Sequence, residues 1–298
     1  MVDETIHQLK KQIQRQRNLK EMIMLASKFA RSRVSLRSDF PLDDDQIKRV
    51  APSIFAVEKH ESRSARYTYI PTSEVLAALR KQGFSPFMVC QAKARDEAKR
   101  EHTKHMLRMR HASQINSKEA NEIILLNSHD GTSSYQMMSG IYRFVCANGL
   151  VCGDTMSDIR IKHKGDIVDN VIEGAFRVLD DFELVGGKMD GMKALTLNAG
   201  EQQAFAHAAL ALKYDTDVAP APVTETQILT PKRFEDRSND LWTTFNRVQE
   251  HLIDGGLRGR TNTGKVRETR PVTGIDQSVK LNRALWVLSE EMRKLKGA

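Results

Sequence analysis

A serine, a histidine and an aspartate stand next to one another in the segment NSHDG, residues 127–131. A hydroxyl, an imidazole and a carboxylate are the groups of a nucleophilic triad, and a nuclease that uses His129 and Asp130 is one hypothesis for them. Neighbouring residues of a strand point to opposite faces, however, and Asp130-Gly131 is a strong turn signal because both residues tolerate positive φ. A metal-dependent nuclease also needs clustered carboxylates, which the sequence does not offer. We therefore predict a turn here, with no catalytic residue, no metal site and no cofactor.

Positive charge gathers in the segment 93–111, which carries seven Lys or Arg residues against three acids. Two strands joined there would form a projecting basic hairpin, and phosphate contacts need only positive charge at a suitable spacing. A solvated hairpin whose charges protect the edge of a sheet is the alternative. The predicted nucleic-acid contacts of this segment are Lys93, Arg95, Lys99, Arg100, Lys104, Arg108 and Arg110.

A second basic segment, residues 257–274, reads LRGRTNTGKVRETRPVTG and is predicted to be a loop. Glu268 is its one acid, and three of its residues are glycine. Arginines between glycines suit phosphate binding, because the backbone amides stay accessible beside the side chains. We expect a polyanion to lie between this segment and the first one. The predicted contacts here are Arg258, Arg260, Lys265, Arg267 and Arg270.

Aromatic residues that could stack on bases follow one predicted strand, residues 134–145. Tyr142 and Phe144 share one face of this strand and Tyr135 lies on the other, because side chains alternate along a strand. Packing in the core is the favoured interpretation, and stacking on a single strand is the alternative. Arg143 points away from its two aromatic neighbours and is the last predicted phosphate contact.

The surrounding pattern predicts an α+β fold in three parts. Residues 1–62 form an N-terminal helical arm, residues 63–165 an antiparallel β-meander with one helix, and residues 166–298 a helical region. Helices are predicted at 3–31, 42–50, 72–82, 201–214, 239–253 and 275–294, and one more begins near residue 166. Strands are predicted at 84–94, 103–112, 121–126, 134–145, 150–152 and 159–163, with Asn148-Gly149 as a turn and 216–231 as a linker.

The composition favours a polyanionic partner. The chain has 298 residues, a net charge of +8 and a hydrophobic content of 40%, which is enough for a core. A solvated basic surface is the alternative. The odd number of cysteines and the absence of a CxxC motif indicate a reducing compartment. Since no segment is long and apolar enough to span a bilayer, we expect a cytoplasmic protein with no membrane partner and no small-molecule substrate.

Several short motifs together resemble the phage/plasmid-like protein family, a domain of unknown function spread among phages, prophages and plasmids. They are residues 69–72 (YIPT), 105–110 (HMLRMR), 127–131 (NSHDG), 143–151 (RFVCANGLV), 241–250 (LWTTFNRVQE), 255–256 (GG) and 281–286 (LNRALW). The resemblance covers most of the chain and implies an origin in a mobile genetic element. The order of helix, β-meander and helices is also similar to that of phage single-strand annealing proteins, which hold single strands in the basic groove of a ring or filament.

These observations predict a nucleic-acid-binding protein that binds or anneals single-stranded DNA in recombination or replication. Its action would be non-catalytic, and we expect it to be a homo-oligomer. The alternative is a phage or plasmid counter-defence protein, whose basic surface would bind and inhibit a host immune complex.

Overall fold

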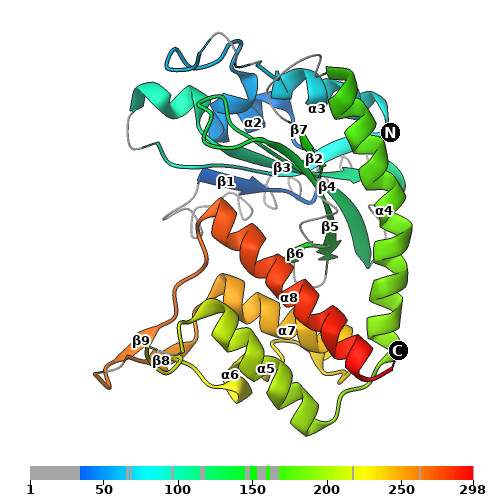
Figure 1. Cartoon of the computed structure of the whole chain (residues 1–298), viewed down its shortest axis with the longest axis vertical. Helices are drawn as coiled ribbons and strands as arrows, with labels where there is room; N and C mark the ends of the chain where they lie inside the picture. Colours follow the sequence, from blue (N-terminus) through cyan, green and yellow to red (C-terminus); the bar gives the residue numbers. More distant parts are fainter. Residues whose placement is uncertain are drawn as a thin grey trace, which may run out of the picture.

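The computed structural model describes residues 34–64, 67, 69–94, 97–114, 118–144, 148–152, 159–161, 168–216, 218–261 and 263–297. The helix predicted at 3–31 and the predicted contact Arg95 lie outside the described residues. An antiparallel sheet lies in the middle of the molecule, and helices form its C-terminal part (Figure 1). The predicted α+β class is therefore confirmed.

Six strands lie in the sheet in the order in which they follow along the chain, and each is antiparallel to its neighbours. They are β1 (Val34–Arg37), β2 (Phe84–Gln91), β3 (His105–His111), β4 (Glu119–Asn127), β5 (Tyr135–Arg143) and β6 (Asn148–Val151). A seventh strand, β7 (Ile159–Ile161), pairs with the Tyr135 end of β5, whereas β6 pairs with its Arg143 end. The sequence does not predict β1. The turn predicted at Asn148-Gly149 is wrong, because both residues pair with β5.

The first face of the sheet packs on helices from the first half of the chain. The helices α2 (Asp44–Val50) and α3 (Thr72–Lys81) share a core with alternate residues of the strands, such as Leu107, Met109 and Ile123. Alternation along a strand is what sorts these side chains onto one face. At the start of α2, Asp43 caps the helix by accepting a hydrogen bond from the backbone of Gln46.

The second face and the β6 edge pack on the C-terminal helices. Met88, Met106 and Met138 share a core with Ile275 at the start of α8 (Ile275–Leu295). A further core joins Ile141 of β5 to α8, to the long helix that precedes the C-terminal helices, and to three more helices. These three are α5 (Ala199–Lys213), α6 (Glu225–Leu229), which lies within the predicted linker, and α7 (Leu241–Asp254).

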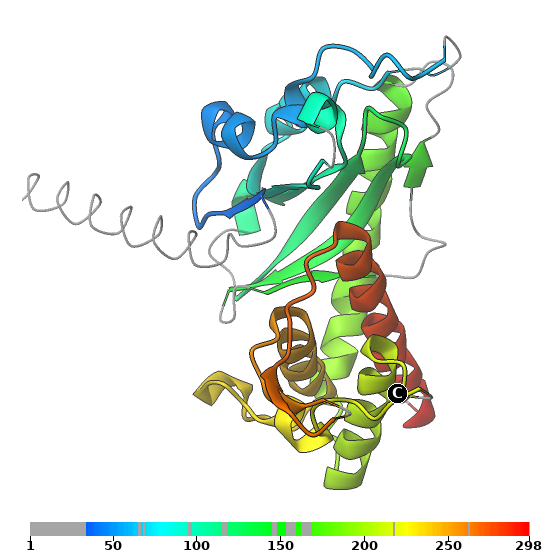
Figure 2. The ribbon, with the colours of Figure 1, turned by 90° about the vertical axis from the view of Figure 1, so that its left-hand side faces the viewer.

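The long helix α4 (Val168–Ala194) connects the two halves of the molecule (Figures 1 and 2). Its residues Val178 and Phe182 pack in the core of the first face, and Val185 and Met192 pack among the C-terminal helices. Although α4 has 27 residues, neither it nor any other described helix has an apolar stretch long enough to cross a membrane.

The second basic segment is a small antiparallel hairpin rather than a structureless loop. Its strands are β8 (Arg258–Arg260) and β9 (Val266–Glu268), and it stands out beside α5 and α6 in Figure 1. The preceding helix α7 ends at Gly255, whose φ is 67°. A Cβ atom at Gly255 would lie 2.5 Å from the carbonyl oxygen of Thr269, so only glycine lets the chain turn back against the hairpin here.

Candidate nucleic-acid interface

Two of the arginines predicted as nucleic-acid contacts on the first basic segment lie in the interior of the protein. Arg108 and Arg110 lie on β3, between β2 and β4, with 4% and 1% of their surface exposed. Both pair with Glu122 of β4, at 2.5 Å from Arg108 Nε to Oε2 and 2.8 Å from Arg110 Nε to Oε1. The prediction that these two residues project toward a phosphate backbone is therefore wrong, because both are buried and their charge is already paired with a carboxylate inside the protein.

The two arginines and their shared carboxylate partner form a buried triad, which aromatic rings and a glycine surround. The guanidinium carbon of Arg110 lies 3.4 Å from the ring centre of Tyr142, which also contacts Phe144 edge-on at 5.0 Å. The predicted shared face of Tyr142 and Phe144 is confirmed, and Tyr142 stacks on an arginine of its own chain instead of on a base. Arg108 lies against Gly149, where a Cβ atom would be 2.6 Å from the guanidinium carbon. Gly149 thus leaves room for a buried arginine rather than forming a turn.

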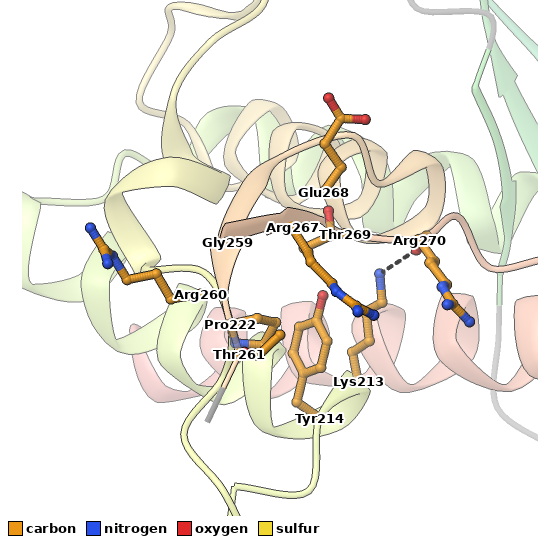
Figure 3. Close-up of a pocket in the computed structure, with 10 residues that line it drawn as sticks. All are labelled: Lys213, Tyr214, Pro222, Gly259, Arg260, Thr261, Arg267, Glu268, Thr269 and Arg270. Carbon is orange, nitrogen blue, oxygen red and sulfur yellow. Dashed lines mark hydrogen bonds between the residues drawn. The ribbon is translucent and has the colours of Figure 1, made fainter. Parts of the chain in front are cut away.

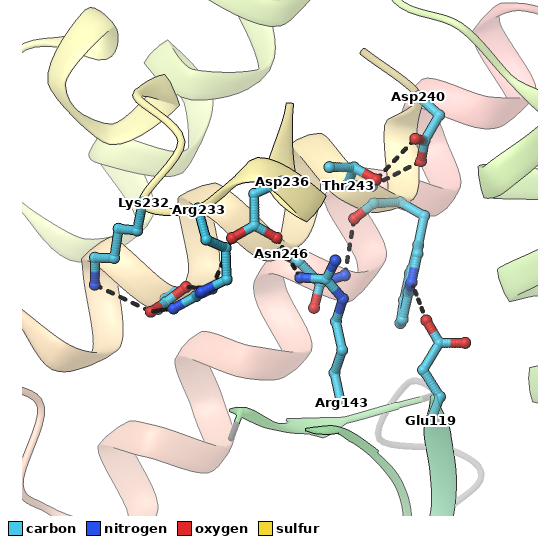
Figure 4. A network of polar contacts seen from close by, with 10 residues as sticks. Glu119, Arg143, Lys232, Arg233, Asp236, Asp240, Thr243 and Asn246 are labelled. Carbon is cyan, nitrogen blue, oxygen red and sulfur yellow. Dashed lines mark hydrogen bonds and ion pairs between the residues drawn. The ribbon is translucent and has the colours of Figure 1, made fainter. Parts of the chain in front are cut away.

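Arg143 joins the sheet to the C-terminal helices (Figure 4). It is 7% exposed, and its Nη1 lies 2.5 Å from Oδ1 of the buried Asp236. The other oxygen of Asp236 lies 2.6 Å from Arg233, which also pairs with Glu250 of α7. The prediction of Arg143 as a phosphate contact is therefore wrong, because its charge is already compensated inside the protein.

The remaining cations of the first segment lie near the loop between β2 and β3. Lys93, Lys99 and Arg100 are exposed, whereas Lys104 pairs with Asp276 at the start of α8, with 2.7 Å from Nζ to Oδ2. In Figures 1 and 2 this loop lies in the half of the molecule opposite to the β8–β9 hairpin. The structure does not bring the two basic segments together, so the prediction of a polyanion lying between them does not fit this arrangement.

The β8–β9 hairpin, by contrast, carries its positive charge on the surface. All five of its predicted contacts are exposed, and among the described residues none of them forms an ion pair with a carboxylate. They are Arg258, Arg260, Lys265, Arg267 and Arg270. Gly259 fixes the hairpin in place, because its Cβ position lies 2.5 Å from the carbonyl oxygen of Pro222, and the neighbouring Arg260 amide donates to that oxygen at 2.8 Å.

A pocket of about 300 Å³ lies between this hairpin and the end of α5 (Figure 3). Lys213 and Tyr214 border it from α5, and Arg267 and Arg270 border it from the hairpin. The ammonium of Lys213 donates to the carbonyl oxygens of Leu252, at 2.6 Å, and Arg270, at 3.3 Å. Burial lowers the pKa of Lys213 to about 8. The sequence gives no signal for Lys213 and Tyr214, because nothing in it shows that the hairpin folds back onto α5.

The NSHDG segment is a turn with structural contacts, as predicted. Asp130 accepts hydrogen bonds from the backbone and the hydroxyl of Thr132, and Gly131 has a φ of 74°. The ring of His129 is buried, with its centre 5.1 Å from the ring centre of His105. His105 lies within hydrogen-bond distance of Ser53 on Nδ1, at 2.8 Å, and of Thr72 on Nε2, at 2.9 Å. Burial lowers the pKa of His105 to about 4, so the ring is neutral at pH 7.

Because His105 is buried, we expect the fold to be sensitive to acid. Its pKa is about 4 in the folded protein and about 6.5 in the unfolded chain, so the unfolded chain takes up the proton first as the pH falls. This residue therefore stabilises the fold above pH 6.5, and the contribution of roughly 3 kcal/mol is lost between pH 6.5 and 4. Urea unfolding at several pH values measures the loss. We expect this loss of stability at low pH to be smaller in His105→Gln and unchanged in the exposed control His207→Gln. Equal losses in both variants would show that His105 does not cause the acid sensitivity.

Comparison with known proteins finds a family whose description states no function. A family model described as a domain of unknown function, DUF932, matches residues 59–286. Two proteins of Escherichia coli (strain K12), UPF0380 protein YfjQ and UPF0380 protein YafZ, are each 55% identical to this chain over 271 residues, which is 91% of this chain and 98% of each of theirs. No solved structure matches the chain. None of these descriptions states a ligand or a reaction.

Proposed function

Because the chain belongs to the DUF932 family, whose description states no function, we propose its function from the charge and shape of the β8–β9 hairpin. The protein binds nucleic acid, and the hairpin contacts the phosphates. The observation that carries this proposal is the contrast between the two sets of arginines. The interior arginines have carboxylate partners, whereas the five hairpin cations are exposed and form no ion pair with any described residue.

Exposed cations that stand this close together repel one another, and a polyanion relieves that repulsion. Arginine and lysine on a short, glycine-containing hairpin can each reach a different phosphate, because successive phosphates of a strand are regularly spaced. The anchoring of Gly259 and Arg260 on Pro222 supports the proposal further, since it fixes the backbone that carries the cations before binding.

The finer proposal is single-stranded DNA binding in the recombination or replication of a mobile genetic element, by a homo-oligomer in the cytoplasm. It rests on the resemblance to the phage/plasmid-like family and on the analogy between the order of helix, sheet and helices and that of single-strand annealing proteins. Light scattering or electron microscopy with and without a single-stranded oligonucleotide tests the oligomer. Retention of one stoichiometric host protein, with no DNA bound, would instead favour the counter-defence function.

The salt dependence of binding tests the proposal directly. If all five hairpin cations contact phosphates of a single strand, the log–log plot of affinity against salt concentration has a slope of about −3.5. Filter binding of the purified full-length protein to a single-stranded oligonucleotide over a series of salt concentrations measures this slope. Undetectable binding at low salt, or tight binding that salt does not weaken, would refute the proposed function.

A further inference from the structure

The pocket beside the hairpin has an apolar part and a positive part. Tyr214, Pro222 and Thr261 contribute apolar surface, while Lys213, Arg267 and Arg270 contribute positive charge. Glu268 also borders the pocket, but its carboxylate points away from Tyr214 in Figure 3. An occupant that suits this pocket is therefore largely apolar, and it is attached to an anionic group.

Tyr214 is held in place by the end of α5. It is the residue directly after the last turn of the helix, in an extended conformation, and its backbone amide donates to the carbonyl oxygen of Leu210. Lys213 beside it is fixed by its hydrogen bonds to Leu252 and Arg270. The ring is half-buried, so part of it remains accessible from the pocket. The backbone that carries the ring is therefore fixed, and a tyrosine side chain has only two rotatable bonds, so little side-chain entropy is lost when a partner packs on the ring.

We propose that the pocket receives the base of an unpaired nucleotide, which stacks on Tyr214 while Arg267 and Arg270 contact the adjacent phosphates. This inference rests on the proposed function and specifies its ligand. A volume of about 300 Å³ is at the small end of the range for ligand pockets and suits one base rather than a base pair. Stacking on an aromatic ring tolerates every base, because each base has a π-face.

The proposal has a consequence for strand preference. A base within a duplex is stacked between its neighbours and paired with the opposite strand, so it reaches the pocket only after it has left the helix. The hairpin cations can contact the phosphates of either form. We therefore expect the pocket, and not the cations, to make the protein prefer a single strand over a duplex.

Substitution of Tyr214 separates the two contributions. We expect Tyr214→Leu, which keeps an apolar side chain but has no ring, to weaken binding of an oligothymidylate by about 5- to 150-fold, since one stacked base contributes about 1–3 kcal/mol. Tyr214→Phe keeps the ring and should bind like the original protein. Both variants should bind the corresponding duplex unchanged, with an unchanged salt slope. Fluorescence polarisation measures the affinities, and thermal unfolding checks that both variants are folded.

A direct signal comes from 2-aminopurine placed in the single strand, because stacking quenches its fluorescence. We expect quenching by the original protein and by Tyr214→Phe, and none by Tyr214→Leu. If Tyr214→Leu binds the single strand as tightly as the original protein and still quenches, the base pocket is wrong, while salt-dependent binding leaves the proposed function intact. If neither strand binds at low salt, the proposed function fails and the base pocket fails with it.

Discussion

Replacement of Glu122 by glutamine is expected to lower the free energy of unfolding by about 3–5 kcal/mol. Glu122 has no exposed surface, and its two carboxylate oxygens pair with two arginines that are themselves almost fully buried. Glutamine keeps the shape but not the charge, so Arg108 and Arg110 remain in the interior without their carboxylate. Such a loss is a large part of the total stability of a domain, about 5–15 kcal/mol.

Urea unfolding followed by circular dichroism measures this effect. Glu268→Gln is a matched control, because it removes an exposed carboxylate from the hairpin and should change the free energy of unfolding by less than about 0.5 kcal/mol. In a second variant Arg108, Arg110 and Glu122 are replaced together by Met, Met and Leu. This variant should recover much of the loss, because no charge then remains to be compensated in the interior. A cost below about 1 kcal/mol for Glu122→Gln would show that the triad does not stabilise the fold.

The buried triad also shows where prediction from the sequence succeeded and where it failed. The alternation around Arg108 and Arg110 predicts a strand, and β3 confirms it. The same alternation cannot tell which face is covered or how far the sheet extends, because distant segments decide both: α8 supplies Ile275 on one face, and β1 adds a strand beyond β2. β1 has only four residues, too few for a recognisable period. The position of Arg108 and Arg110 in the middle of the sheet was therefore outside the reach of local patterns.

The candidate site, too, could be predicted from the sequence only in part. The hairpin cations could be predicted, because charge and glycine content are local properties of residues 257–274. Its strands could not, because each has only three residues, too few for a recognisable period. Tyr214 could not be predicted either, since it reaches the hairpin through the packing of α5 on α7 and α8. Sequence reasoning thus identified the charges of the site but not the pocket beside them.

The sequence predicted two basic segments, and charge substitution decides which of them binds nucleic acid. One variant replaces Arg260, Lys265 and Arg267 of the hairpin by glutamine. The other replaces Lys93, Lys99 and Arg100 of the loop between β2 and β3, which are also exposed. Both lose the same net charge, so any effect of overall charge on binding is the same in the two proteins.

We expect the hairpin variant to bind a single-stranded oligonucleotide on the order of 100-fold more weakly at about 0.1 M salt. Each lost phosphate contact costs about 1 kcal/mol under these conditions, or roughly fivefold in affinity. The slope of the salt dependence should become shallower by about 2, because three contacts disappear. The loop variant should stay within about threefold of the original protein and keep its slope, since its cations lie in the other half of the molecule.

The reverse result would assign binding to the loop between β2 and β3 and would remove the hairpin from the interface. Equal losses in both variants would mean that overall charge, not a defined surface, attracts the strand. Only a loss confined to the hairpin variant agrees with the proposed interface. The exposed cations of the hairpin lie beside a pocket that can take a base. In the other segment, by contrast, Arg108 and Arg110 are buried and paired with Glu122.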